Sequence, residues 1–392
     1  MNMYFDNNFL IRYTREIFTG TSCNLRCKYC YEKDHSQAPV TKEDVKAFLD
    51  YIYERDHING TFKNKGYKSP KINFIGGEPF LYPDLIDYAT EIAHNHNLKY
   101  GLTERGVISN VITNGTLIST SKDVQNLLKK WGRKISLSIS IDGTKETNDA
   151  NRLDINGNGS YDSIIAGYKL AKDIIGNDLC FAKMTLNHAN FHTLSEGVIN
   201  LFNEGFDKVQ CTVVIEENWP ESEEEYVYQQ YLLLIDYMID TKLYKSKLFL
   251  PFSRGLTYEK VISHNPNCSA CSDGMCCISP DHHIYGCHHL ASNIIHKKES
   301  ALGVVENNVV NIYNPQILNV ISDVWKYRPE KCLTCPISQH CTHCAGAIFE
   351  NNPDDLGELF RLYNQCGYTK GLHKARMVFK DRVAQAETPQ DE

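Results

Sequence analysis

The sequence predicts an α/β protein in which a mostly parallel sheet closes partly into a barrel of six βα units, followed by a smaller cysteine-rich domain. Two observations support this fold class. Apolar runs of strand length alternate with helical patterns from about residue 11 to residue 214. Beyond that region the patterning weakens, and ten of the 15 cysteines fall between Cys268 and Cys366. We therefore expect metal to replace an apolar core as the main stabiliser of the second domain.

Six apolar runs define the expected sheet, and the loops at their carboxyl ends are where parallel barrels place their chemistry. The expected strands are residues 15–19, 71–75, 107–113, 134–141, 180–186 and 208–214.

Helical patterns separate these runs. Thr41 opens a variant of the capping box ahead of apolar residues that recur with helical period. Ser160 is expected to cap a later helix. Further helices are expected over residues 83–95, 124–131, 194–203 and 226–242.

The 392 residues suffice for one large domain and a smaller one. An acidic segment that contains Trp219 follows the last expected strand and is interpreted as a boundary with a solvated surface. The expected divisions are a barrel over 1–215, a linker and bridging helix over 216–254, a cysteine-rich domain over 255–370, and a carboxyl-terminal helix with a polar tail over 371–392.

Composition excludes several classes of protein. The formal net charge is −7, and no block of Lys and Arg suggests a nucleic-acid footprint. No apolar run approaches the roughly eighteen residues of a membrane span, and the charged amino terminus is no signal peptide. The odd number of closely spaced cysteines favours metal over disulfides. We therefore expect a cytoplasmic protein that binds neither nucleic acid nor a membrane.

The most informative stretch is the loop after the first expected strand, where Cys23, Cys27 and Cys30 are spaced C-x₃-C-x₂-C. Three such thiolates can ligate three irons of a [4Fe–4S] cube and leave the fourth iron open for a small chelating ligand. A zinc loop is the alternative for the same residues. Tyr29 stands directly before the third cysteine.

This spacing, with Tyr29 in that place, resembles the signature of the radical S-adenosylmethionine (radical SAM) enzymes. The resemblance implies that the amino and carboxylate groups of S-adenosylmethionine (SAM) chelate the open iron. It also implies that the cluster donates an electron, which cleaves SAM and releases a 5′-deoxyadenosyl radical. An external one-electron reductant, a flavodoxin or a ferredoxin, would supply that electron.

Further motifs follow in the order of that family. Gly76-Gly77-Glu78-Pro79 comes directly after the second expected strand, and its two glycines let backbone approach a ligand closely. The Glu78 carboxylate can accept hydrogen bonds from a cationic amine. The resemblance implies that this turn holds the amino group of SAM, and an ordinary turn is the alternative.

Other segments resemble the rest of the family's cofactor site. Ser140 ends the fourth expected strand, and the resemblance places it at the ribose. It likewise implies that Arg152 contacts the carboxylate of SAM, although a plain surface arginine is the alternative. Tyr29 is expected to lie by the adenine, with Leu186 from the end of the fifth strand on its other side.

The late cysteines resemble a SPASM domain, the auxiliary-cluster module of radical SAM enzymes that modify peptides. Their core is a C-x₂-C-x₅-C-x₂-C pattern, and the resemblance implies two auxiliary [4Fe–4S] clusters, hence three clusters in all. One auxiliary cluster would bind Cys332, Cys335, Cys341 and Cys366. The other would bind Cys287, Cys344 and two of Cys268, Cys271, Cys276 and Cys277. The candidates taken from that last group are Cys268, Cys271 and Cys277.

The segment departs from the family pattern in two places. The last interval of the pattern is x₂ where the family usually has x₃, which leaves the role of Cys344 open, and His282 stands where the family usually has glycine. Structural zinc is the alternative here, because paired C-x₂-C thiolates bind zinc readily. A zinc site made by the C-x₂-C pairs would leave Cys287 and Cys366 with no metal to bind.

His288 directly follows Cys287. One branch of the family, the anaerobic sulfatase-maturating enzymes, has an aspartate in that place as general base, so the histidine counts against that branch. A histidine can also act as a base near neutral pH, which makes His288 the catalytic candidate. An imidazole that only supports a neighbouring ligand, or one that faces solvent, is the alternative.

Together these motifs resemble enzymes that abstract a hydrogen atom from a residue of a ribosomally made precursor peptide. The expected product is a crosslink within the peptide, through a thioether or a carbon–carbon bond. Backbone excision, epimerisation and oxidation of the sulfatase-maturase kind are the alternatives. Only about ten residues precede the first expected strand, so the precursor's leader would be held by the SPASM side or by a separate leader-binding protein. Two other classes also remain, an iron–sulfur electron-transfer protein and a zinc-stapled interaction module.

Overall fold

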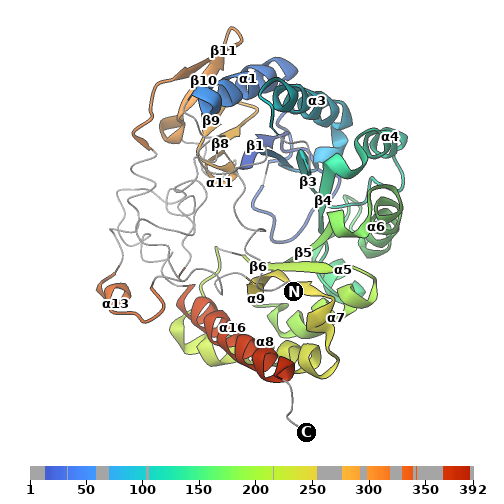
Figure 1. The fold of residues 1–392 in the computed structure, drawn as a ribbon, viewed down its shortest axis with the longest axis vertical. Coiled ribbons are helices and arrows are strands. Elements are labelled where there is room, and N and C mark those ends of the chain that lie inside the picture. Colours follow the sequence, from blue (N-terminus) through green and yellow to red (C-terminus); the bar gives the residue numbers. More distant parts are fainter. Residues whose placement is uncertain are drawn as a thin grey trace.

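The protein is described by a computed structural model that covers residues 14–32, 34–58, 70–102, 106–214, 216–253, 276–291, 298–317, 329–338, 341 and 365–388. Within these residues a single mixed sheet of 11 strands runs in the order β11-β10-β9-β8-β1-β2-β3-β4-β5-β6-β7. Figure 1 shows the sheet curving through the molecule, with helices along its outside.

The first six strands are parallel and follow one another in chain order, as expected of a partial barrel. They are β1 (Thr14–Phe18), β2 (Lys71–Ile75), β3 (Ser109–Thr113), β4 (Ile135–Ser140), β5 (Cys180–Leu186) and β6 (Lys208–Val213). The fold-class prediction is therefore confirmed, and each expected strand end lies within about two residues of the observed one, the usual uncertainty of element boundaries.

The alternation along β4 shows why these segments form strands. Ile135, Leu137 and Ile139 are fully buried, and they share one apolar core with residues of the surrounding helices. Ser138 and Ser140 alternate with them and are partly exposed on the inner face of the sheet. The inner face is thus free to carry polar groups.

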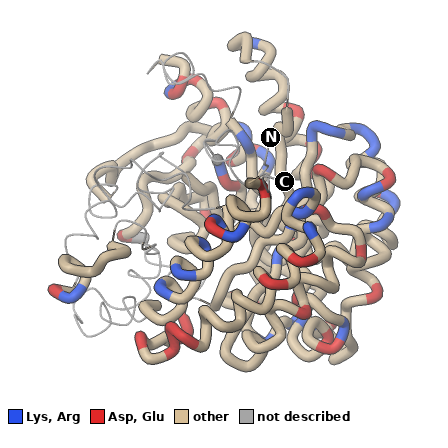
Figure 2. The backbone as a smooth tube through the Cα atoms, turned by 60° about the horizontal axis from the view of Figure 1, so that its bottom comes forward, with Lys and Arg blue, Asp and Glu red and all other residues tan. Residues whose placement is uncertain are grey.

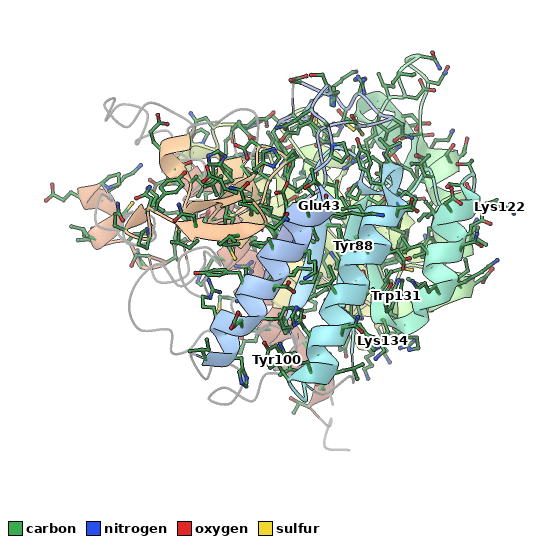
Figure 3. All side chains as sticks on the ribbon, turned by 90° about the horizontal axis from the view of Figure 1, so that it is seen from above. Glu43, Tyr88, Tyr100, Lys122, Trp131 and Lys134 are labelled. Atoms are coloured by element: carbon green, nitrogen blue, oxygen red, sulfur yellow. The ribbon has the colours of Figure 1, made fainter. Side chains whose placement is uncertain are left out.

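The helices that follow the strands pack around the outside of the sheet. They are α1 (Lys42–Ile58), α3 (Pro83–Lys99), α4 (Lys122–Trp131), α5 (Lys145–Asn151), α6 (Tyr161–Ile175), α7 (Leu194–Asn203) and α8 (Glu224–Asp240). Figure 3 shows α1, α3 and α4 side by side, with Trp131 on α4. The indole Nε1 of Trp131 donates to Asp87 on α3 at 2.7 Å, which joins the two helices.

Ser160 does not cap α6, contrary to expectation. Its hydroxyl makes no capping hydrogen bond and donates instead to the carbonyl of Arg152 at 2.7 Å. The carboxylate of Asp149 takes the capping role, because it accepts from the amide of Tyr161 at 2.8 Å. Ser160 therefore fixes the segment that ends at Arg152.

Part of the cysteine-rich region continues the same sheet. β8 (Cys276–Ile278) pairs in parallel with β1, so that Cys276 lies beside Arg15 and Cys277 beside Glu16. Three antiparallel strands extend this edge: β9 (His283–Tyr285), β10 (Gly303–Glu306) and β11 (Val309–Ile312). Sequence patterning had indicated no strands here. The domain limits stay predictions.

At the other edge, β7 (Leu248–Phe249) pairs with β6, and α16 (Cys366–Glu387) packs along α8. Close approach of these helices requires glycine, since a Cβ on Gly371 would lie 2.7 Å from the carbonyl oxygen of Glu224. The carboxyl-terminal helix expected within residues 371–392 is α16, which begins earlier, at Cys366, and continues to Glu387.

The remaining elements are short. They are α9 (Leu250–Ser253), α11 (His288–Ala291), α13 (Glu330–Leu333), and the 3₁₀ helices η2 (Pro79–Leu81), η3 (Gly132–Lys134), η4 (Asn177–Leu179), η5 (Phe191–Thr193), η6 (Glu221–Glu223), η7 (Leu243–Lys245) and η8 (Lys298–Ser300).

Acidic and basic residues are mixed over the outer helices in Figure 2, and no broad basic face appears in that view. In the part of the chain that the structure describes, no helix is long and apolar enough to cross a membrane.

Candidate functional site

The loop after β1 carries three partly exposed cysteines, Cys23, Cys27 and Cys30. Backbone hydrogen bonds fasten this loop to the segment after α5. The amide of Arg26 donates to the carbonyl of Leu153 at 2.7 Å, and the amide of Lys28 donates to that of Asn151 at 3.0 Å. The loop therefore lies over the carboxyl ends of the strands as part of the barrel.

Burial is the main cause that raises the pKa of Cys23, and Cys27 and Cys30 both act to raise it further, so the three thiols lie near one another, as ligands of one cluster would. Among the residues that the structure describes, no three His, Cys, Asp or Glu side chains converge on a point where one ion would be held. A [4Fe–4S] cube needs no such convergence, because each thiolate binds a different iron.

A cavity of about 760 Å³ opens beside the cysteine loop. Its walls come from the segments after β1, β4, β5 and β6, where parallel barrels place their chemistry. Tyr29 and Cys30 line the cavity, and Asn151, Asn187 and Val214 are among the other lining residues. A ligand in the cavity would therefore contact the cysteine loop directly.

The turn after β2 packs directly against the start of the cysteine loop. A Cβ on Gly76 would lie 2.4 Å from the carbonyl oxygen of Gly20, and one on Gly77 would lie 2.2 Å from that of Ser22. The amide of Gly77 donates to Gly20, and the amide of Glu78 to Ser22. The two glycines thus let the turn after β2 approach the cysteine loop closely. The sequence interpretation explained the glycines by close approach to a ligand and did not include this contact between loops.

Glu78 is fully buried, and its carboxylate already accepts hydrogen bonds from other residues of the protein. Oε1 accepts from the amide of Phe80 at 2.9 Å and from the hydroxyl of Thr113 at 2.7 Å, and Oε2 accepts from the amide of Asn114 at 2.7 Å. Burial raises the pKa of Glu78 to about 7, although these hydrogen bonds act to lower it. Together with Pro79, which begins η2, Glu78 ties the turn after β2 to the end of β3.

Tyr29 and Arg152 meet at Asp142, a fully buried carboxylate just beyond β4. The Tyr29 hydroxyl donates to Oδ2 of Asp142, and Nη2 of Arg152 donates to Oδ1 at 3.0 Å. The guanidinium also lies over the Tyr29 ring, 5.4 Å from its centroid. Arg152 is thus a buried site residue, and its alternative as a surface arginine was wrong.

One polar atom in this group lacks a partner. Nε of Arg152 is buried and has no hydrogen-bond partner among the described residues. An unpaired buried guanidinium nitrogen beside the cysteine loop fits a ligand that carries a carboxylate.

Ser140 and Leu186 lie on different faces of the sheet. Ser140 ends β4 on the partly exposed inner face, on the side of the barrel interior. Leu186 is fully buried in the core with Ala182 and Met184, which alternate with the inner-face residues of β5. This packing lends no support to a contact between Leu186 and a ligand, whereas the next residue, Asn187, lines the cavity.

Neighbouring cysteines of β8 point to opposite sides. Cys277 is buried in a small cluster with Cys287 and Tyr285. Cys276 belongs to the main core, where Arg15 and Arg55 act on its thiol. Among the described residues, Cys277 is the one of the two that packs in a cluster with another candidate ligand, Cys287.

The remaining cysteine candidates are only partly described. Four of them are partly exposed: Cys332, Cys335, Cys341 and Cys366. Cys332 lies on α13, with its carbonyl accepting from the amide of Cys335 at 3.4 Å, and Cys366 begins α16. Cys268, Cys271 and Cys344 lie outside the described residues, so their ligand roles stay predictions.

His288 pairs with a buried carboxylate of β1. Its ring Nδ1 lies 2.9 Å from Oε2 of Glu16, and its amide donates to the same oxygen at 3.0 Å. His288 is therefore held against β1 and is only partly exposed, which fits the alternative in which it supports a neighbouring ligand, and its catalytic role stays a prediction. The neighbouring His289 lies 5.8 Å from the ring of Tyr31, and burial lowers its pKa to about 3.

The acidic segment after β6 is more than a solvated surface. Glu217 lines the cavity, and its Oε2 accepts from the amide of His188 at 2.8 Å. The His188 ring stacks on Trp219 with centroids 3.9 Å apart. The side-chain amide of Gln365, next to Cys366, donates to the Glu217 carbonyl at 2.7 Å, so this segment joins the cavity wall to the start of α16.

Several residues of the site escaped the sequence interpretation. Neither Asp142 nor Asn114 was among the expected site residues. Nδ2 of Asn114 lies 2.8 Å from Oδ1 of Asn24 and 3.9 Å from the Cys23 sulfur. The position of Asn114 and Asp142 directly after strands β3 and β4 was the available signal, since ligands bind outside the carboxyl ends of parallel strands.

Residues 17–218 match the profile of the Radical SAM superfamily. The chain belongs to this superfamily. The protein is therefore a radical SAM enzyme, and membership implies SAM and a [4Fe–4S] cluster as its cofactors.

Curated relatives match this radical SAM protein over part of their length. The cysteine-type anaerobic sulfatase-maturating enzyme of Clostridium novyi is 32% identical over 158 residues, which are 38% of this chain and 38% of that protein. The S-adenosylmethionine-dependent nucleotide dehydratase of Pseudoalteromonas ulvae is 30% identical over 135 residues, 31% of this chain and 37% of that protein. The chain thus matches less than half the length of these relatives.

Solved structures share the fold of nearly the whole radical SAM chain. The anaerobic sulfatase-maturating enzyme anSMEcpe with bound AdoMet aligns over 97% of both chains, with a TM-score of 0.70 and 17% identity. Streptococcus suis SuiB bound to the precursor peptide SuiA aligns over 87% of this chain and 74% of that chain, with a TM-score of 0.55 and 15% identity. The similarity of fold therefore extends beyond the barrel into the carboxyl-terminal region.

Proposed function

We propose that this radical SAM enzyme modifies a residue within a peptide by removing a hydrogen atom and then one further electron. The observation that carries the proposal is the cysteine loop, which forms a wall of the cavity at the carboxyl ends of the strands. The peptide is supported by the fold shared with SuiB bound to its precursor peptide and by the sulfatase-maturating enzymes among the relatives.

We assign each residue of the cofactor site a contact that fits its position. Cys23, Cys27 and Cys30 would ligate the cluster, whose reaction with SAM supplies the abstracting radical when both are bound. The Nε of Arg152 would meet the SAM carboxylate, and Tyr29 would lie by the adenine. The other contacts proposed are Ser140 to the ribose and Gly76, Gly77, Glu78 and Pro79 to the amino group.

The turn after β2 would meet the amino group mainly through its backbone. The Glu78 carboxylate already accepts from Phe80, Thr113 and Asn114, so its main action is to hold the turn in place. A backbone carbonyl in such a turn is an acceptor for an ammonium group.

Two auxiliary clusters would accept the second electron. The proposed ligands of one are Cys332, Cys335, Cys341 and Cys366. For the other we propose Cys277 and Cys287, which share a buried cluster, together with ligands from Cys268, Cys271 and Cys344. Three [4Fe–4S] clusters in all, an external flavodoxin or ferredoxin, and a leader-binding site on the SPASM side or on a separate protein complete the proposal.

Among peptide modifications we favour a crosslink within a leader-bearing precursor. The reason is His288, which stands where the resemblance to sulfatase maturases calls for an aspartate, and which pairs with Glu16. A histidine held by a carboxylate is a suitable proton acceptor for the residue that is oxidised. Sulfatase-type oxidation is the second candidate, favoured by the curated relatives.

Mass spectrometry of candidate peptides incubated with the reconstituted enzyme, SAM and reductant tests the proposal. A crosslink removes two hydrogens, a loss of about 2 Da, because abstraction is followed by one-electron oxidation. Conversion of a sulfatase-type cysteine replaces sulfur by oxygen and gives a different mass change. Epimerisation leaves the mass unchanged, and backbone excision removes far more. Cleavage of SAM with every peptide unchanged would contradict a peptide substrate.

A further inference from the structure

We propose that Asp142 is the positioning residue of the cofactor site, the group that holds Tyr29 and Arg152 together in the orientation that SAM requires. This inference rests on the proposed contacts of SAM with Tyr29 and Arg152. Asp142 does not line the cavity, and it acts only through the two side chains that it binds.

The Asp142 carboxylate divides its two oxygens among three elements. Oδ2 accepts from the Tyr29 hydroxyl of the cysteine loop. Oδ1 accepts from Nη2 of Arg152, after α5, and from the amide of Thr185 in β5, both at 3.0 Å. One buried side chain at the end of β4 thus joins the cysteine loop to the two segments beside it.

This arrangement leaves Arg152 little freedom. Asp142 binds one terminal nitrogen, and the Tyr29 ring covers one face of the guanidinium plane. The carbonyl of Arg152 accepts from Ser160, which fixes the backbone as well. The unpartnered Nε is therefore held in one direction before any ligand binds, and such preorganisation reduces the entropy lost on binding.

A carboxylate accepts from all three donors and also supplies the counter-charge of Arg152. An asparagine at position 142 would place an amide N–H either against the Tyr29 hydroxyl, which would have to turn and accept, or against the Arg152 guanidinium, which cannot accept. In both cases the buried guanidinium would lose its counter-charge. Hydrogen bonds to charged groups are the stronger class, so Asp142→Asn is expected to weaken SAM binding by about tenfold or more.

A merely structural role for Asp142 is the competing explanation, and the chain offers a matched control. Arg15 and Asp56 form another buried pair, 2.5 Å apart, on β1 and α1. Asp56→Asn removes the same charge from the same kind of pair, without contact with Tyr29 or Arg152. It is expected to lower stability and to leave SAM binding within about twofold of the wild type, a change of less than half a kcal/mol.

The first experiment measures both variants as full-length, reconstituted protein. SAM binding is followed by the change in the electron paramagnetic resonance spectrum of the reduced cluster. Hydrogen exchange without SAM is followed at the amides of Arg26 and Lys28, which donate across to the segment after α5. Asp142→Asn is expected to raise the dissociation constant and to speed exchange at both amides. Equal effects in Asp56→Asn, or no effect in Asp142→Asn, would overturn the inference.

A second experiment covers the case in which Asp142→Asn does not fold. Tyr29→Phe removes only the hydroxyl that Asp142 accepts, and it keeps the ring. Faster exchange at Lys28 with a weaker SAM affinity supports the inference, and unchanged values of both overturn it. Where the protein folds, Asp142→Asn in a Tyr29→Phe, Arg152→Ala background is expected to cost little further affinity, because both side chains through which Asp142 acts have already lost their contact with it. A full additional loss in that background overturns the inference.

The two proposals fail in different ways. If the wild-type enzyme bound no SAM, the proposed cofactor contacts themselves would be refuted. A wild-type enzyme that binds and cleaves SAM, with Asp142→Asn indistinguishable from it, would remove only the positioning role.

Discussion

The ring Nδ1 and the backbone N–H of His288 both meet one oxygen of Glu16, at 2.9 and 3.0 Å. Glu16 lies in the middle of β1, and His288 directly follows Cys287. The pair therefore joins the first strand of the barrel to the cysteine-rich region. Burial acts to raise the pKa of Glu16, but His288 outweighs it and the pKa is lowered.

Glu16→Gln is expected to destabilise the protein by about 1–3 kcal/mol at neutral pH, since a charged acceptor of two hydrogen bonds is lost. A lowered pKa in the folded state means that this stabilisation is present above the usual value of 4.5 and is lost as the pH falls through the folded-state pKa. Urea unfolding of both proteins, at pH 7 and then stepwise below 4.5, measures it. A difference that widened on acidification would contradict this account.

Gly77→Ala is expected to displace the cysteine loop. The added Cβ would lie 2.2 Å from the carbonyl oxygen of Ser22 and 2.4 Å from that of Thr21, both backbone atoms that cannot move aside separately. We expect a loss of SAM cleavage by at least about tenfold, the equivalent of 1.4 kcal/mol.

The matched control is Gly157→Ala, in an exposed turn where a new Cβ meets no atom within 4 Å. Its φ of +84° adds backbone strain of about 1–2 kcal/mol but leaves the site alone. Cleavage assays and thermal unfolding of both variants separate the two effects. Comparable loss of cleavage in both would show that displacement of the loop is not the cause.

The barrel was predictable because the apolar pattern of each strand differs clearly from the helical pattern of the segments on either side. In β4 the residues Ile135, Leu137 and Ile139 alternate with serines, and this pattern specifies both the strand and its faces. β8 to β11 gave no such signal. β8 contains two adjacent cysteines, whose chemistry suggested ligands in a loop, and its place beside β1 depends on pairing across more than two hundred residues.

Site residues were predictable where several of them form a recognisable motif. They were not predictable where a single residue acts through others. Cys23, Cys27 and Cys30 carry a spacing that sequence alone displays. Asp142 and Glu16 act through partners that are distant in sequence, and no local pattern shows that a carboxylate will be buried against a tyrosine or a histidine. Leu186 is an apolar residue of the kind expected beside an adenine, but the alternation along β5 directs its side chain toward the core.

Glu78→Gln is expected to show the opposite pH dependence to Glu16→Gln. The pKa of Glu78 is raised to about 7 in the folded state, mainly by burial. The stabilisation that comes from binding the proton is therefore fully present below the usual 4.5, and it is lost as the pH rises through about 7. The wild type should lose stability relative to Glu78→Gln over that interval. Urea midpoints at steps from pH 4.5 to 8 measure the change, and a wild type that gained on the variant across this range would refute it.

The neighbouring cysteines of β8 form a matched pair whose effects on iron content are expected to differ. Cys277 lies in a buried cluster with Cys287, whereas Cys276 belongs to the core on the side of Arg15. If Cys277 is a ligand, Cys277→Ser will lower the iron content of the reconstituted protein or alter the spectrum of an auxiliary cluster. Cys276→Ser, the same change one residue away, will do neither. The reverse outcome would mean that β8 presents its other face to the cluster.

Measuring iron in the reconstituted protein also counts its clusters. Three [4Fe–4S] clusters hold about twelve irons per chain, and changing Cys23, Cys27 and Cys30 together to Ala should leave about eight. The triple variant should also abolish SAM cleavage while the auxiliary clusters persist, since their proposed ligands lie elsewhere in the chain. Iron and sulfide analysis with X-ray absorption checks both numbers. Zinc bound at Cys332 and Cys335 would replace the auxiliary cluster proposed there with a structural zinc site, because paired C-x₂-C thiolates also bind zinc readily.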